Sequence, residues 1–448
     1  MAKPRLSDAP DFGPGAISNG AWGHNLTEGK DHGPGQTLHR GDNNMGEQFD
    51  RAASLNELCR AVRECKRGVT HKDGPVDWYL HRLIKAEALQ RDILRGKYHL
   101  RPGTKVQIYR PKRREAVAPW FRDRVWQRSM CNNGIYEDLT RSLCYDNGAC
   151  QKGRGTEQAI RRTIYFLQRI YRTTGSNAGW GLHEDIHKYF PSTPHEQVRQ
   201  QDIRMVSEPL FLPYLFEIID SVKDPREPEI IALDPFGERG TGLGSQLNQL
   251  NQVALQNDID HELKTFCKYS ERYMDDFLIL DAKKEICVRA KETIGWMLKA
   301  KGLEGVDKGG IFRLKDGFWF LRHRFVLTDT GKVIVKMHPE NIRYEKRALN
   351  GLREALYRGE TDMDYIRMQY QTFVAQCTYC TGNGPLHMMD EYYKGLFREK
   401  PEYKVTRRYL HGNHQERKKA EPGAAAGERA AQEQSGEAAG DAGVPGHP

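Results

Sequence analysis

Apolar residues recur along the chain with two different spacings, and their alternation predicts a mixture of helices and strands. Apolar positions three and four residues apart predict helices at 78–94, 156–170 and 340–396. Short apolar runs bounded by turn residues predict strands at 105–111, 180–186, 269–282, 318–327 and 332–335. The run at 269–282 has an Asp-Asp pair at its centre and is expected to fold into a hairpin about that pair. Because no regular strand–helix–strand rhythm is present, the pattern favours an α+β fold over a doubly wound parallel sheet.

Both ends of the chain lack the apolar residues that a core requires. Residues 1–50 carry nine glycines and few aliphatic side chains, and beyond residue 410 the only branched aliphatic residue is Val444. Such segments bury too little apolar surface to offset the entropy lost on ordering. We therefore expect a disordered arm at 1–50, a disordered tail at 409–448 and a folded part between them.

The length and composition exclude several classes of protein. A chain of 448 residues is long enough for two or three domains. It contains no run of about 18 apolar residues, so no transmembrane helix is expected, and its first residues lack the apolar stretch of a secretory signal. Nine cysteines without framework spacing predict reduced thiols and a cytoplasmic protein.

The basic excess of the chain is concentrated in one segment. The whole chain has 69 Lys and Arg against 60 Asp and Glu, a net charge of +9, and residues 95–128 alone carry the same excess. Aromatic residues are interleaved with the charges, at Tyr98, Tyr109, Trp120, Phe121 and Trp126. This combination is typical of a surface that binds phosphates and stacks bases, with a solvated basic face as the alternative.

The strongest chemical signal is a pair of adjacent carboxylates, Asp275 and Asp276, which follow Tyr273 and Met274 in the predicted hairpin. Acidic pairs are common in ordinary turns, but carboxylates placed between apolar strands are costly unless a cation binds them. A third carboxylate, Asp185, lies near the end of another predicted strand. Three carboxylates from neighbouring strand ends could hold two Mg²⁺ ions about 3.5–4 Å apart. Such a pair of ions activates a 3′-hydroxyl and stabilises a leaving pyrophosphate.

With this set of motifs the sequence resembles the reverse transcriptases, or RNA-directed DNA polymerases, especially those of bacterial retroelements and phage-defence systems. The segment around Asp185 resembles polymerase motif A, and residues 273–276 match the YxDD box of motif C. Between them, residues 240–249 resemble the glycine-rich motif B, with Asn248 where many relatives have Ser. A second register would put Ser245 in that position, but its glycine spacing fails. The resemblance extends over roughly residues 75–400.

The resemblance implies a right-hand polymerase architecture. Fingers would span 51–178, a palm with an antiparallel sheet packed on helices 179–335, and a helical thumb 336–408. Asp185, Asp275 and Asp276 would be the catalytic residues. Together with the Ile186 carbonyl they would hold two Mg²⁺ ions, with Mn²⁺ as a substitute.

The resemblance also implies a nucleotide site formed by Lys112, Arg114, Phe190, Gly244 and Gln249. Phe190 stands at the position of the steric gate, where a ring excludes the 2′-hydroxyl of a ribonucleotide. The neighbouring tyrosine at 189 is the other candidate for that position, or a core residue. Lys112 and Arg114 match the fingers segment that binds the triphosphate, with template binding as the alternative.

Four further residues are assigned by the same resemblance. Tyr273, Met274 and Leu321 would contact the primer or template. Lys308 matches loosely the lysine of motif D, a proposed proton donor to pyrophosphate, and a plain surface lysine is the alternative.

Other candidate ligands form no recognised pattern. Cys377 and Cys380 make a CxxC pair, but no second pair accompanies it at zinc-site spacing, which favours free thiols. His183, His187 and His195 surround motif A without metal-ligand spacing.

The partners implied are an RNA template, a DNA or RNA primer, dNTPs and a structured noncoding RNA, with no membrane. Two alternatives keep the fold, namely an RNA-binding scaffold similar to a splicing maturase and the polymerase of a diversity-generating retroelement. An RNA-dependent RNA polymerase is disfavoured by Tyr273-Met274 and by Phe190. The polymerase motifs do not distinguish phage defence from a retroelement role.

Overall fold

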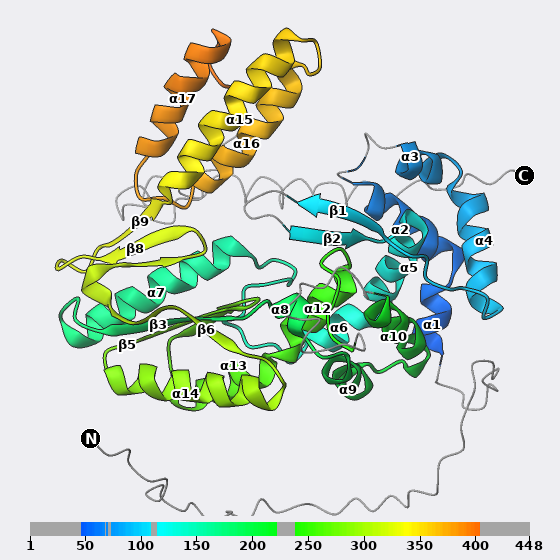
Figure 1. Ribbon diagram of the computed structural model, residues 1–448, viewed down its shortest axis with the longest axis horizontal. Coiled ribbons are helices and arrows are strands. Elements are labelled where there is room, and N and C mark those ends of the chain that lie inside the picture. Colours follow the sequence, from blue (N-terminus) through cyan, green and yellow to red (C-terminus); the bar gives the residue numbers. More distant parts are fainter. Residues whose placement is uncertain (1–45, 68, 70–72, 109–113, 222–237, 404–448) are drawn as a thin grey trace, which may run out of the picture. The chain divides into compact units, whose positions relative to one another are not determined.

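The computed structural model describes residues 46–67, 69, 73–108, 114–221 and 238–403 (Figure 1). All of these residues belong to one compact unit. The predicted tail at 409–448, and the predicted arm up to residue 45, lie outside the described residues. Helix α1 (Glu47–Ala52) begins inside the predicted arm.

The first part of the described chain is mainly helical. It continues with α2 (Leu55–Lys66), α3 (Asp73–Leu80), α4 (Arg82–Leu94), the hairpin of β1 (Thr104–Ile108) and β2 (Arg114–Ala118), α5 (Phe121–Met130), a π-helical turn (Cys131–Ile135), α6 (Tyr136–Thr140) and α7 (Thr156–Thr174). Ser54 caps α2 by accepting the N–H of Glu57, and Gly175 ends α7 in the left-handed conformation. The helix predicted at 78–94 is in fact two helices, which are separated at His81.

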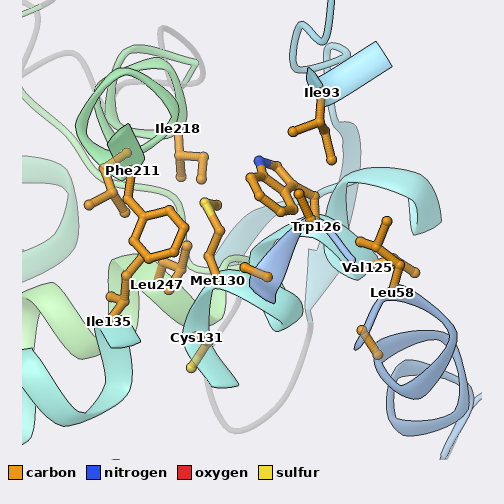
Figure 2. Close-up of a cluster of buried hydrophobic side chains, with 14 of the residues drawn as sticks. Leu58, Ile93, Val125, Trp126, Met130, Cys131, Ile135, Phe211, Ile218 and Leu247 are labelled. Carbon is orange, nitrogen blue, oxygen red and sulfur yellow. The ribbon is translucent and has the colours of Figure 1, made fainter. Parts of the chain in front are cut away.

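A hydrophobic core joins this helical part to two later helices, α10 (Leu212–Asp220) and α12 (Gln246–Leu255). Figure 2 shows Trp126 of α5 in this core, and its indole is fully buried near Ile93 and Met130. Ile218 of α10 and Leu247 of α12 complete the same cluster. The helix that follows the predicted glycine-rich motif therefore packs directly on the N-terminal helices.

The expectation that the aromatic residues of 95–128 form a base-stacking surface is wrong for most of them. Trp126 and Tyr98 are buried, and Phe121 packs against the same core. Trp120 is 51% exposed, and Tyr109 lies outside the described residues. Trp126 and Phe121 belong to α5, a helix that is covered on nearly every side, since even its charged residue Asp123 is fully buried.

Part of the basic excess in the same segment is neutralised by acidic residues. The Arg128 guanidinium lies 2.6 Å from a carboxylate oxygen of Glu64, which is far away in the sequence. Arg122 pairs with Asp123 at 3.1 Å, and Asp123 also accepts the Tyr98 hydroxyl at 2.9 Å. Asp123 is already counted in the sum for this segment, but Glu64 lies outside it, so the charge available to a polyanion is smaller than that sum.

A four-stranded antiparallel sheet forms the centre of the described fold, with the order β4-β5-β3-β6. The strands are β3 (Trp180–Ile186), β4 (Ser270–Tyr273), β5 (Asp276–Asp281) and β6 (Gly305–Arg313). Helices α13 (Asn257–Phe266) and α14 (Lys284–Ala300) cover one face, and α7 covers the other (Figure 1). The predicted α+β fold with an antiparallel sheet is confirmed.

Short helical elements follow β3 along the chain and lead to α10 and α12. They are α8 (Tyr189–Ser192), α9 (His195–Met205) and a 3-10 turn (Pro209–Phe211). The loop that leads to α12 is tied to them, because Gly240 N–H donates to the Thr193 carbonyl at 2.9 Å. His195, which is buried, contacts the Gly240 carbonyl through Nε2 at 2.7 Å.

A second antiparallel sheet, β7-β8-β9, leads into the last three helices. It follows a 3-10 turn (Leu314–Asp316) and consists of β7 (Phe318–Phe320), β8 (His323–Leu327) and β9 (Val333–Met337). The segment predicted as one strand at 318–327 is therefore itself a hairpin. Helices α15 (Pro339–Tyr357), α16 (Met363–Cys377) and α17 (Gly384–Phe397) pack together around their own apolar cluster (Figure 1).

Within the described residues, no helix combines the length and the hydropathy that a membrane crossing requires. The CxxC pair lies at the end of α16, where both thiols are free. Burial raises the pKa of the Cys380 thiol to about 11, so this cysteine stays protonated at neutral pH. The boundaries proposed for fingers, palm and thumb remain predictions.

Candidate active site

The two adjacent carboxylates lie at the turn between β4 and β5. Tyr273 pairs with Asp276, so Met274 and Asp275 form the two-residue turn between the strands. Met274 has φ 59°, a left-handed conformation that costs about 1–2 kcal/mol for a residue with a Cβ atom. Strained backbone of this kind is concentrated at functional sites.

Strand pairing brings the third carboxylate to the same place. The register of β3 and β5 pairs Glu184 with Phe277, and its continuation puts Asp185 opposite Asp276. Leu182 of β3 and Phe277 of β5 both point into the core formed with α13 and α14. Because side chains alternate along a strand, Asp185 and Asp276 share the opposite face of the sheet.

A cavity of about 360 Å³ lies beside this turn. It is lined by His183, Tyr273, Met274, Asp275, Asp276, Trp319, Phe320, Leu321 and Arg322. The structure therefore brings the predicted primer contacts at 273, 274 and 321 together with two of the predicted catalytic carboxylates. The turn between β7 and β8 supplies Leu321 and Arg322, which have φ of 47° and 63°. Such paired left-handed residues give the tight hairpin that points this turn at the cavity.

His183 belongs to this site, although its sequence context did not distinguish it from a surface histidine. Its Nε2 lies 3.2 Å from a carboxylate oxygen of Asp276, and its ring packs edge-on against Phe320 at 5.8 Å. The available signal was strand parity, since a residue two positions before Asp185 on a strand faces the same side. The contact itself depends on the pairing of β3 with β5.

Carboxylate oxygens are the donors that Mg²⁺ prefers, so the chemistry of Asp185, Asp275 and Asp276 fits this ion. Ile186, whose carbonyl was predicted as a further ligand, is the last residue of β3. As the described side chains stand, no three His, Cys, Asp or Glu residues are grouped closely enough to hold a metal ion. The two-metal site stays a prediction.

The structure separates the roles of the two aromatic residues after motif A. Tyr189 is buried, donates its hydroxyl to the Gln252 carbonyl at 2.5 Å and accepts a bond from Gln256 at 3.0 Å. Burial raises the pKa of Tyr189 well above its usual range. Phe190 is half-buried, and its carbonyl accepts the Thr241 N–H at 2.9 Å. Tyr189 is thus a core residue, which leaves Phe190 as the candidate gate.

Gly244 and Gln249 line a second cavity, of about 280 Å³, together with Glu64, Arg124, Gln127 and Arg128. A Cβ atom on Gly244 would lie 2.1 Å from the Val117 carbonyl oxygen, so this glycine lets the loop pack against β2. The close backbone contact at Gly244, which the resemblance assigns to the nucleotide site, is thus made with a neighbouring strand. The amide of Gln249 donates to the Leu243 carbonyl at 3.2 Å.

The two registers considered for motif B correspond to two structural roles. Ser245 is the N-cap of α12, since its hydroxyl accepts the Asn248 N–H and donates to Gln127 at 3.0 Å. Asn248 is buried in the first turn of the helix and donates to the Gly242 carbonyl at 3.3 Å.

Three predicted site residues cannot be placed by their side chains. Lys112 lies outside the described residues. Arg114 begins β2 and Lys308 lies within β6, but the described part of the chain includes only their backbone. Their roles at the triphosphate and as a proton donor remain predictions.

Comparison with known proteins gives a limited result. No family model matches the sequence, and no curated protein matches it. Among solved structures, apo telomerase from Candida tropicalis, truncated from its C-terminal domain, aligns with a TM-score of 0.38 and 11% identity. Telomerase from Candida albicans in complex with the TWJ fragment of telomeric RNA aligns with a TM-score of 0.39 and 12% identity. These alignments cover 56% and 60% of this chain and span only 60% and 55% of the telomerase chains.

Proposed function

We propose that the chain is an RNA-directed DNA polymerase that adds dNTPs to a primer 3′-hydroxyl by two-metal-ion nucleotidyl transfer. The observation that supports this most is the antiparallel pairing of β3 with β5, which ends with Glu184 opposite Phe277 and whose continuation would face Asp185 with Asp276. Two sequence motifs, 91 positions apart in the numbering, thereby contribute carboxylates to adjacent strands, and Asp276 lines a cavity together with Tyr273 and Met274.

Each residue has a defined task in this proposal. Asp185, Asp275 and Asp276, with the Ile186 carbonyl, would hold Mg²⁺, or Mn²⁺ in its place. When bound, the two ions supply the charge that activates the 3′-hydroxyl and stabilises pyrophosphate.

The remaining assigned residues bind and orient the substrates. Tyr273, Met274 and Leu321 line the cavity where the primer end would lie. Lys112, Arg114, Gly244 and Gln249 would bind the dNTP, and Lys308 would give a proton to pyrophosphate. We place the enzyme in a bacterial phage-defence system or retroelement, with an RNA template and a structured noncoding RNA as partners.

Primer extension with the purified chain tests the proposal. The reaction contains an RNA template, a DNA primer, Mg²⁺ or Mn²⁺, and either dNTPs or rNTPs. We expect the primer to be extended with dNTPs, and the sequence of the product to be complementary to the RNA template. RNA binding without extension with either ion would instead favour the maturase-like scaffold.

Replacement of Phe190 with alanine is expected to weaken the selection of deoxyribonucleotides. Removing the ring opens space for a 2′-hydroxyl, so the ratio of kcat/KM for rNTP to that for dNTP should rise roughly 10- to 100-fold. Single-nucleotide incorporation with matched dNTP and rNTP measures this ratio. The control is Tyr189→Phe, which removes only a buried hydroxyl and should keep the ratio of the wild type. An unchanged ratio in Phe190→Ala would remove the gate assignment.

A further inference from the structure

Arg272, the residue before the YxDD box, has a side chain that is 1% exposed, although it carries a full charge. Its Nε lies 2.7 Å from one carboxylate oxygen of Asp260, and its Nη2 lies 2.7 Å from the other. Burial would lower the pKa of Arg272, but the neighbouring Asp260 raises it, so the guanidinium is charged. The two residues form a buried, bidentate ion pair between β4 and α13.

The same guanidinium also holds two main-chain carbonyls. Nη1 donates to the Met274 carbonyl at 2.9 Å, and Nη2 donates to the Val253 carbonyl at 2.8 Å. Val253 lies in the last turn of α12, where helix carbonyls have no partner inside the helix. One side chain therefore joins the acidic turn to the ends of two helices.

The backbone of Arg272 is fixed as well. Its N–H donates to the Asp146 carbonyl at 3.0 Å, and its carbonyl accepts the Gly148 N–H at 3.1 Å. The Asn147 side chain between them donates to Asp260 at 3.3 Å. The loop before α7 thus reaches the same ion pair.

These contacts bear on the acidic turn because Met274 has a left-handed backbone and directly precedes Asp275. A conformation that a residue with a Cβ atom disfavours persists only where its surroundings hold it. Buried ion pairs add little net stability but can select one geometry. The planar fork of arginine can bridge several acceptors at once, which the single ammonium of lysine cannot do.

We propose that Arg272 is a positioning residue whose guanidinium, anchored by Asp260, holds the Met274 carbonyl and thereby directs Asp275 and Asp276 toward the cavity. The proposal rests on the proposed polymerase function for its kinetic consequences, but not for the geometry of the turn. Arg272 itself touches no reacting atom.

The test compares the wild type with Arg272→Lys, which keeps the charge but loses the fork. We expect kcat for primer extension to fall about 100-fold, because a displacement of about 1 Å at reacting groups has this effect. The KM for dNTP and the Kd for primer–template duplex should stay within about twofold, and the Mg²⁺ concentration for half-maximal activity should rise. Asp260→Asn should show the same pattern, and the two changes combined should lose little more than either one.

The matched control is Arg199→Lys, in which the arginine pairs with Asp220 on α10, outside the set of residues that line the cavity. It should retain the wild-type kcat and Mg²⁺ dependence. For each variant, the loss of kcat is compared with the loss in the free energy of unfolding in urea. If this ratio is the same for Arg272→Lys and Arg199→Lys, Arg272 is merely structural and the proposal is overturned.

Hydrogen exchange separates this proposal from the proposed function. Amides at 273–276 should exchange faster in Arg272→Lys than in the wild type, whether or not the chain polymerises. If Arg272→Lys does not fold, the same measurement on Asp260→Asn decides. A wild type that extends no primer would end the polymerase proposal, whereas unchanged exchange at the turn would end this one.

Discussion

Changing Asp275 and Asp276 together to asparagine is expected to abolish primer extension, with a loss in kcat on the order of 10³-fold or more. Asparagine keeps the size of aspartate and its tolerance of turns, so the hairpin should fold. The charge that would bind the proposed Mg²⁺ ions is lost, and such ions contribute several kcal/mol of transition-state stabilisation. Asp276→Asn can still accept a hydrogen bond from His183, which lies 3.2 Å away in the wild type.

Steady-state extension with dNTPs and Mg²⁺ measures this loss, and the circular dichroism spectrum checks the fold. The matched control is Asp281→Asn, at the opposite end of β5, where the carboxylate accepts only the Lys283 N–H at 2.9 Å among the bonds described for it. This control should retain wild-type activity. A double variant that extends primers as fast as the wild type would exclude the carboxylates from catalysis.

The second large effect is a loss of stability as the pH rises, caused by Glu271 in β4. Its side chain is 1% exposed, and neither carboxyl oxygen has a hydrogen-bond partner among the described residues. Burial, together with the nearby Asp146, raises the pKa of Glu271 to about 8, while Lys264 and Arg162 act in the opposite direction. The folded chain therefore keeps this carboxyl protonated at neutral pH.

The sign of the pH dependence follows from the two pKa values. The ordinary value is 4.5, so between pH 4.5 and about 8 the folded chain holds a proton that the unfolded chain has released. The contribution to the free energy of unfolding is complete below the ordinary pKa and is lost as the pH rises to about 8. Each pKa unit corresponds to about 1.4 kcal/mol, so the loss should reach a few kcal/mol.

Urea unfolding of Glu271→Gln from pH 5 to pH 9 measures this contribution. Glutamine resembles the protonated acid, so the variant should match the wild type at pH 5 and exceed its stability at pH 9. Burial also raises the pKa of Asp202 to about 8, so the wild-type slope contains both carboxyls and only the difference isolates Glu271. The control Glu292→Gln, on the exposed side of α14, retains Glu271, so its stability should follow that of the wild type at every pH. A difference between variant and wild type that stays constant with pH would mean that Glu271 does not titrate in this range.

The sequence was sufficient for features that depend on neighbouring residues. The strand predicted at 180–186 is β3, and the hairpin about Asp275-Asp276 is β4 and β5. Both were readable because apolar runs and turn residues are local signals. The proximity of Asp185 to the hairpin was expected from its place near a predicted strand end and from the resemblance, and the pairing of β3 with β5 supplies its physical basis.

Contacts between residues that are far apart in the sequence could not be predicted from local patterns. The charge of Arg128 is matched by Glu64, 64 positions earlier, and Gly244 packs on Val117. Neither contact follows from the residues around it. Trp126 was misjudged because its ring is buried by distant residues such as Ile218 and Leu247, which the basic residues beside it do not reveal.

The bonds between β4 and the loop before α7 have a consequence for self-association. β4 is an edge strand of the central sheet, and edge strands tend to pair with strands of other molecules through their exposed main-chain N–H and C=O groups. Here the main-chain N–H and C=O of Arg272 on that edge are already hydrogen-bonded to Asp146 and Gly148. An assembly that extends this sheet through main-chain hydrogen bonds is therefore expected to add its strand at β6, the other edge, and not at the edge that carries the acidic turn.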